Sequence, residues 1–275
     1  MSIQQRISLI IFSLLLAVGF YVSFGIAYEG KANAVSATRT IQKDRAAIIA
    51  PILLYHHIAE GEDSRYYVSP ARFEQQMSLL YSLGYTTIPV SRLVEAMHDD
   101  TVILPARPLV VTFDDGNLDV YQTAYPIMQK YAFTATMYLV GKYLNSEGFV
   151  STDQMREMIA AGWEIGSHSM SHVKLFEAQS LSDEILESRL FLEEKIDTPV
   201  YSFAYPFGIY DAMLAEKVKS YGYRAGLGLG TSSEHTLESL FYLSRIEIKQ
   251  DTHLYEFNAS LPWKSTDYLY LRMSN

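Results

Sequence analysis

Short apolar runs of β-prone residues alternate with helical patterns from residue 52 to residue 248. The runs are residues 52–57, 85–90, 109–113, 134–140, 163–166, 200–205, 223–227 and 243–248. Helix-period stretches lie between them at residues 70–83, 91–98, 121–131, 152–161, 181–196 and 211–221. Three of these stretches stop at a glycine followed by an aromatic residue, which is typical of βαβ units. The alternation predicts an α/β fold built as a closed or nearly closed parallel barrel, with an open doubly wound sheet as the alternative.

The composition agrees with a folded body of this kind. The 275 residues are 49% hydrophobic and 19% charged, which excludes a disordered chain. A mean hydropathy of +0.02 excludes a polytopic membrane protein. Cysteine is absent, which excludes a disulfide scaffold, a thiolate metal site and a cysteine nucleophile. Residues 51–275 carry a net charge of −12, which argues against a nucleic-acid partner.

The third run ends in two adjacent carboxylates. Active sites of parallel barrels lie at the C-terminal ends of the strands, and here the sequence is Thr112-Phe113-Asp114-Asp115-Gly116. Neighbouring carboxylates repel one another and resist desolvation unless a cation or hydrogen-bond donors hold them, so the pair suggests a metal site. A solvated turn is the alternative, because Asp-Asp-Gly also suits a β-turn.

The fifth run is followed by His168-Ser169-Met170-Ser171-His172. Two imidazoles four residues apart converge on one cation if the segment makes a helical turn, and neutral imidazole suits zinc and other first-row divalent ions. Two surface histidines are the alternative. Together with Asp115 they would supply one carboxylate and two imidazoles, leaving coordination positions for water and substrate.

Two further strand ends carry candidate residues. The sixth run leads into residues 203–208, Phe-Ala-Tyr-Pro-Phe-Gly, which predict a loop fixed by proline and glycine. The first run ends in His56-His57. Because side chains alternate along a strand, only one of the two histidines should face the barrel interior, where it would donate a proton at neutral pH.

The order of these motifs resembles the polysaccharide deacetylase family (NodB homology domain, carbohydrate esterase family 4) over roughly residues 51–250. It is most similar to the branch that includes exported deacetylases of poly-N-acetylglucosamine. The resemblance implies a distorted (β/α) TIM-like barrel that holds a divalent metal, usually zinc. The residue types alone also suit Co²⁺, Ni²⁺ or Fe²⁺. The implied reaction removes N-acetyl, or sometimes O-acetyl, groups from a glycan.

Matched position by position, the resemblance implies a role for six residues. Asp114 would be the catalytic base, and the metal ligands would be Asp115, His168 and His172. His56 would be the general acid, and the backbone N–H of Phe207 would stabilise the oxyanion. The late Leu-x-His motif, which supplies the acid elsewhere in the family, has no good copy here. His253 is interpreted instead as the start of a helix.

One position departs from the family pattern. Many members have an arginine that opens the third motif and tethers the catalytic carboxylate, whereas this chain has Ala204. Arg245 in the last run is the candidate replacement, with an ordinary surface charge as the alternative. Without a compensating cation, activity would be weak or absent. A non-catalytic glycan-binding relative and a glycosidase that uses Asp114 and a distant glutamate therefore stay open.

The N-terminus predicts a membrane-directed segment. Residues 7–28 contain no charge between Arg6 and Glu29 and would reach roughly 33 Å as a helix, enough to span a bilayer. We interpret residues 1–28 as a signal anchor, or a signal peptide if cleaved, and residues 29–50 as a linker. Residues 51–275 form the catalytic domain. The domain is expected outside the cytoplasm, on the membrane or secreted, with an N-acetylated glycan as its substrate.

The remaining histidines and a cluster of acids are expected at the surface. His98 and His235 lie away from every motif and should be solvated. The set Glu184, Glu187, Glu193 and Glu194 should form the exposed face of its helix.

Overall fold

The computed structural model describes residues 46–60 and 64–266. The predicted membrane-directed segment at residues 7–28 and most of the predicted linker lie outside this part of the chain. Within it, no helix is both long enough and apolar enough to cross a bilayer. Residues 46–50, assigned to the linker from sequence, are part of the described body.

A parallel sheet forms the centre of the body, and each predicted run contributes one strand to it. The strands are β2 (Ile52–Tyr55), β5 (Thr86–Thr87), β6 (Pro108–Phe113), β7 (Thr136–Leu139), β8 (Glu164–Ser167), β9 (Ser202–Ala204), β10 (Ala225–Leu227) and β12 (Ile246–Glu247). Their order is β10-β9-β8-β7-β6-β2-β12, with β5 paired to β6. Leu243, just before β12, bridges in parallel to Leu227 of β10. The sheet is therefore curled into a parallel half-barrel whose edges meet at this bridge, and the α/β prediction is confirmed.

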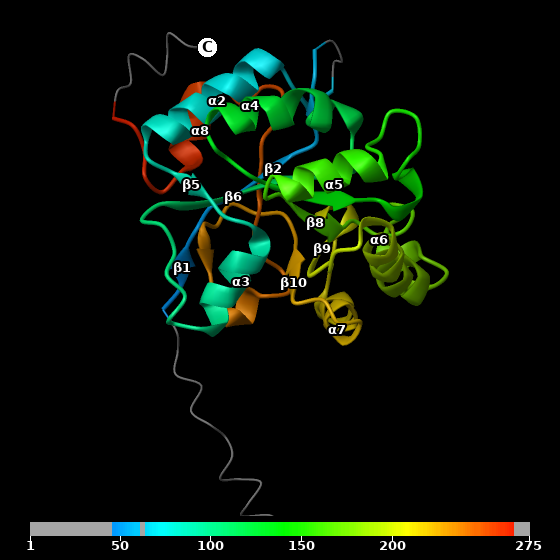
Figure 1. Cartoon of the computed structure of the whole chain (residues 1–275). Coiled ribbons are helices and arrows are strands. Elements are labelled where there is room, and N and C mark those ends of the chain that lie inside the picture. The colour runs from blue at the N-terminus through cyan, green and yellow to red at the C-terminus, as the bar shows by residue number, and fades with distance from the viewer. Residues whose placement is uncertain (1–45, 61–63, 267–275) are drawn as a thin grey trace, which may run out of the picture. The chain divides into compact units, whose positions relative to one another are not determined.

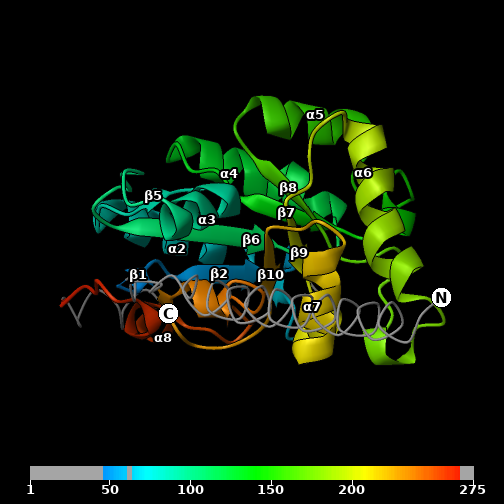
Figure 2. The same cartoon turned by 90° about the horizontal axis from the view of Figure 1, so that it is seen from below.

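Helices lie around the sheet, and most of them cover its outer face, whereas α3 packs against the inner core (Figures 1 and 2). They are α2 (Pro70–Ser82), α3 (Val90–His98), α4 (Tyr125–Lys130), α5 (Thr152–Ala160), α6 (Ser188–Ile196), α7 (Ala212–Ser220) and α8 (Leu254–Ser260). Side chains cap several N-termini: the Ser69 hydroxyl accepts from the Arg72 N–H, and Asp211 accepts from the Leu214 N–H. His253 is the N-cap of α8, so its interpretation as a helix start is confirmed.

Two short strand pairs flank the barrel and were not predicted. β1 (Ile48–Ile49) pairs antiparallel with β11 (Glu234–His235), and β3 (His57–Ile58) pairs in parallel with β4 (Tyr67–Val68). Two residues are too few to show a hydrophobic period. The first pair overturns the expectation for His235, which is buried with its Nε2 3.0 Å from the Ala50 carbonyl oxygen. His98 is exposed, as expected.

Alternate side chains of each strand enter two separate apolar cores. Ile52, Val110, Tyr138, Ala204 and Leu227 pack inside the barrel. Leu53, Val111, Met137 and Phe203 pack outside, against the helices. Because side chains alternate along a strand, the inward series continues past the strand ends to His56, Asp114, His168 and Arg245. The alternation of side chains that builds the core therefore also directs these four polar residues toward the mouth of the barrel.

Gly166 of β8 is expected to be intolerant of any side chain. A Cβ there would overlap the ring of Tyr138, whose hydroxyl is 2.9 Å from Ser202 Oγ inside the barrel. Gly166→Ala should therefore lower the free energy of unfolding by about 1–3 kcal/mol, through overpacking. In a Tyr138→Leu background the cost should shrink, because the ring atoms are gone. Urea unfolding of the four proteins measures this coupling, and strictly additive costs would contradict it.

Candidate functional site

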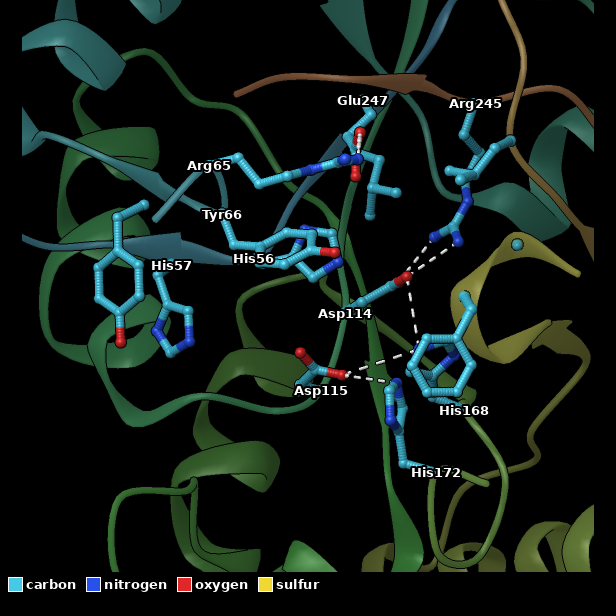
Figure 3. A pocket seen from close by; sticks show the side chains of 15 residues that line it. His56, His57, Arg65, Tyr66, Asp114, Asp115, His168, His172, Arg245 and Glu247 are labelled. Carbon is cyan, nitrogen blue, oxygen red and sulfur yellow. Dashed lines mark hydrogen bonds and ion pairs between the residues drawn. The ribbon is translucent and has the colours of Figure 1, made fainter. Parts of the chain in front are cut away.

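A pocket of about 390 Å³ opens where the strands end (Figure 3). All seven site residues proposed from the sequence line it: His56, Asp114, Asp115, His168, His172, Phe207 and Arg245. They come from the ends of β2, β6, β8 and β9 and from the segment that enters β12. The curled sheet thus brings together groups that are far apart in the chain.

Asp114 is buried and held by Arg245. The two guanidinium Nη atoms donate to Asp114 Oδ1 and Oδ2 at 2.7 and 2.9 Å, a bidentate pair. Asp114 is 2% exposed and Arg245 1%. Burial raises the pKa of the Asp114 carboxyl, but the charges of Arg245 and His168 and the hydrogen bond from Arg245 outweigh it and bring the pKa to about 2. Asp114 is therefore an ionised carboxylate with a fixed orientation.

Arg245 is itself fixed by the barrel interior. Its Nε donates to the Gly228 carbonyl at 3.0 Å, and its guanidinium lies 5.5 Å from the centre of the Tyr138 ring. The sequence left Arg245 open between a partner of the carboxylate and an ordinary surface charge, and its burial excludes the surface position. Ala204, the position where many relatives carry arginine, is fully buried among apolar side chains.

Asp115, His168 and His172 converge on one point. One ligand atom from each lies within 4.8 Å of the other two. His172 Nε2 is 3.4 Å and His168 Nε2 3.7 Å from Asp115 Oδ1. Asp115 Oδ1 is buried and has no hydrogen-bond partner in the described part of the chain. An unpaired buried carboxylate oxygen facing two imidazole nitrogens is the donor set expected of a divalent-metal site.

The protonation of His168 also fits a metal ligand. Its Nδ1 is 2.8 Å from the Ala204 carbonyl oxygen, so Nδ1 carries the proton and Nε2 presents its lone pair to the pocket. Burial lowers the pKa of His168, although the charges of Asp114 and Asp115 oppose the shift. The imidazole is therefore neutral, and its contacts with both aspartates reflect convergence on a common point rather than ion pairs.

Four residues around the pocket have a left-handed backbone although none is glycine. They are Asp115 (φ 73°), Ser169 (φ 69°), His172 (φ 56°) and Phe207 (φ 61°). Such conformations cost free energy and persist where the surrounding structure enforces them. The strain is therefore concentrated in the loops that present the candidate metal ligands.

Glu184 holds the loop that carries both histidines. Its carboxylate accepts from the Ser171 N–H at 2.9 Å and from the Ser171 hydroxyl at 2.5 Å, and its carbonyl accepts from the Met170 N–H at 3.0 Å. The Ser169 hydroxyl accepts from the His172 N–H at 2.9 Å. The prediction that Glu184 lies on an exposed helix face is therefore wrong, because the helix begins beside this loop.

Phe207 presents two groups to the pocket. Its side chain is 48% exposed and its ring lies 4.7 Å from the ring of His172. Its backbone N–H donates to no protein acceptor within the described residues, whereas the next N–H, of Gly208, donates to the Tyr205 carbonyl. An N–H left without a partner at a pocket wall can donate to a bound molecule.

His56 lies beside Tyr66 in the pocket, with the centres of the two rings 4.7 Å apart (Figure 3). Burial lowers the pKa of its imidazole, while the charges of Asp114 and Asp115 oppose the shift. A lower pKa makes the protonated imidazole a stronger acid.

Sequence reasoning missed several charged residues of this wall. Glu247 lies at the end of β12, lines the pocket and forms an ion pair with Arg65. Asp119 bonds His57, the second histidine of the pair. No local motif marks either acid, because each acquires its partner only when distant strands are brought together.

Comparisons with known proteins agree with this geometry. A sequence model of the polysaccharide deacetylase family matches residues 102–226, which include Asp114, Asp115, His168, His172 and Phe207 but neither His56 nor Arg245. YxkH of Bacillus subtilis, provisionally named a polysaccharide deacetylase, is 29% identical, with 72% of this chain and 71% of that protein aligned. A poly-β-1,6-N-acetyl-D-glucosamine N-deacetylase of Staphylococcus aureus is 24% identical, with 72% and 73% aligned.

The fold is also matched by a solved structure. The deacetylase PplD of Streptococcus pyogenes, in complex with acetate, aligns with a TM-score of 0.72 at 25% identity, over 78% of this chain and 99% of that one. In sequence over residues 102–226, and in fold, the chain is therefore similar to the polysaccharide deacetylases.

Proposed function

We propose that this protein is a metal-dependent deacetylase that removes N-acetyl groups from an N-acetylglucosamine-containing polysaccharide outside the cytoplasm. One observation carries the proposal: an arginine-held carboxylate, Asp114, lies beside the Asp115, His168 and His172 set in a single pocket. Amide hydrolysis needs a base for water and an electrophile for the carbonyl, and the two halves of this site suit those tasks.

The chain's own residues account for the proton transfers. A divalent metal held by Asp115, His168 and His172 would supply Lewis acidity toward the acetyl carbonyl and a lower pKa for water. Asp114 accepts a proton as the water oxygen bonds to the acetyl carbon. The free N–H of Phe207 donates to the developing oxyanion, a contact that contributes about 3 kcal/mol in comparable sites. His56 protonates the nitrogen as the C–N bond breaks, which leaves acetate and a free amine.

Two lines of support bear on the substrate and its location. The Staphylococcus aureus relative is named for action on poly-β-1,6-N-acetyl-D-glucosamine. The uncharged segment at residues 7–28 favours export, so the enzyme would meet wall or exported polymers. Zinc is the first candidate for the metal, since a carboxylate with two imidazoles suits it, while cobalt, nickel and iron are alternatives.

Asp114→Asn is expected to abolish acetate release while leaving metal binding intact. The amide cannot accept the proton of water, yet it has nearly the same size and is not one of the three converging ligands. Acetate release from β-1,6-linked N-acetylglucosamine oligomers should fall about 100-fold or more. Asp153→Asn, at an exposed aspartate of α5, is the matched control. Full turnover by the Asp114 variant would overturn the assignment of the base.

Arg245→Met should impair both folding and catalysis, because Asp114 would be left buried and unpaired. Removing one partner of a buried pair typically costs about 3–5 kcal/mol. Arg245→Lys keeps the charge but loses the bidentate geometry, so it should retain stability better than it retains kcat. Urea unfolding and acetate release of both variants test this. Wild-type kcat in the methionine variant would show that Asp114 needs no tether.

Removal of the metal by a chelator should abolish acetate release, and one equivalent of added divalent metal should restore it. Calorimetric titration with Zn²⁺, Co²⁺, Ni²⁺ and Fe²⁺ ranks the candidate metals. His168→Ala should weaken binding in each titration, whereas His98→Ala, at an exposed site, should not. Acetate release that persists in metal-free protein would contradict metal dependence. Shortened rather than deacetylated oligomers would indicate a glycosidase.

A further inference from the structure

The loop after β6 holds the histidine pair from both sides. Each carboxylate oxygen of Asp119 contacts a different group. Oδ2 lies 2.6 Å from His57 Nδ1, and Oδ1 accepts from the Ile58 N–H at 2.9 Å. Asn117 Nδ2 donates to the His56 carbonyl at 3.3 Å. The backbone on both sides of the His56 side chain is therefore tied to the loop that carries Asp114 and Asp115.

His57, which links Asp119 to the backbone of His56, is itself held in place. Because Nδ1 faces a carboxylate, it carries the ring proton. The imidazole stacks on Tyr67 with a ring separation of 4.1 Å and an interplanar angle of 4°. The His57 N–H donates to the Tyr66 carbonyl at 3.1 Å. Ring and backbone of His57 are thus both fixed.

His56, in contrast, has nothing comparable to orient it. Its Nδ1 is buried and has no hydrogen-bond partner within the described residues, and the nearest restraint on the ring is its contact with Tyr66. A proton donor without a carboxylate to align it depends on its backbone for position. A misplacement of about 1 Å can cost a catalytic group about 100-fold in rate.

The loop that carries Asp119 is well suited to this task. Gly116 has a φ of 83°, and a Cβ there would lie 2.9 Å from Leu139 Cδ2. The Leu118 N–H donates to the Gly148 carbonyl, and the Val150 N–H donates to the Gly116 carbonyl, both at 2.9 Å. A turn fixed in this way holds Asp114 and Asp119 in a constant position relative to one another.

We propose that Asp119 is a positioning residue, which aligns His56 with the scissile amide through His57 and Ile58. The proposal rests on the proposed deacetylase function and extends it, because it identifies what orients the acid. Asp119 then affects the step in which the leaving nitrogen is protonated, and not the attack on the carbonyl.

Two substrates separate these steps. A β-1,6-linked N-acetylglucosamine pentasaccharide has an amine leaving group that must be protonated, whereas 4-nitrophenyl acetate releases a stable phenolate that needs no proton. With metal-loaded protein, Asp119→Ala should lower kcat on the pentasaccharide about 100-fold or more, as His56→Ala should. KM and the rate on 4-nitrophenyl acetate should stay within about threefold of the wild-type values.

The conservative variant and a control complete the experiment. Asp119→Asn can still accept from the Ile58 N–H through Oδ1, and its Nδ2 can donate to His57 Nδ1 once the His57 ring proton moves to Nε2, so it should recover most of the activity that alanine loses. Asp153→Ala, at the exposed aspartate of α5, should match the wild type on both substrates. Thermal unfolding checks that every variant is folded.

Three results would overturn the inference. Equal losses on both substrates would show that Asp119 supports the site as a whole, and unchanged amide hydrolysis would show that it supports nothing catalytic. Asparagine as inactive as alanine would mean that charge, and not position, is required. A wild-type protein that releases no acetate from any glycan would overturn the proposed function, whereas selective failure in the variants leaves that function standing.

Discussion

The buried ion pair between Asp114 and Arg245 is the interaction on which the rest of the site depends. It joins the end of β6 to the segment that enters β12, 131 residues further along the chain. That segment also bridges β10, so the pair lies where the curled sheet closes. A buried pair contributes little net stability by itself, but the loss of one partner is costly. The orientation of the carboxylate therefore depends on a contact made where the two edges of the curled sheet meet.

The same geometry resolves the departure at Ala204. The family pattern implied an arginine in the third motif; this chain instead holds Asp114 with Arg245, which contacts Gly228 and the Tyr138 ring. A barrel permits such an exchange, because side chains from several strands reach its mouth. A cation at the mouth can thus be supplied from more than one strand without changing the carboxylate that it holds.

The candidate site is built from strained loops that are attached to rigid strands. Two of the three candidate metal ligands, Asp115 and His172, have a left-handed backbone, and each such residue costs about 1–3 kcal/mol. Hydrogen bonds from the Ser171 and His172 N–H groups to the side chains of Glu184 and Ser169 hold the histidine loop against that cost. A loop fixed before substrate arrives keeps its ligands converged, which is the preorganisation that a metal site requires.

The strands, the alternation of side chains along them and the motif residues could be predicted from the sequence, because each of them depends on a local pattern. Alternation along the first run predicted that only one of His56 and His57 would face inward, and the resemblance selected His56. Only the tertiary structure decided which groups meet: Arg245 with Asp114, Glu184 with Ser171, and Asp119 with His57. Those pairs depend on strand order and on the curl of the sheet, and a charged residue leaves no local signal of the distant partner that it will contact. For that reason His235 and Glu184 were wrongly predicted at the surface, and Arg245 stayed open between a partner of the Asp114 carboxylate and an ordinary surface charge.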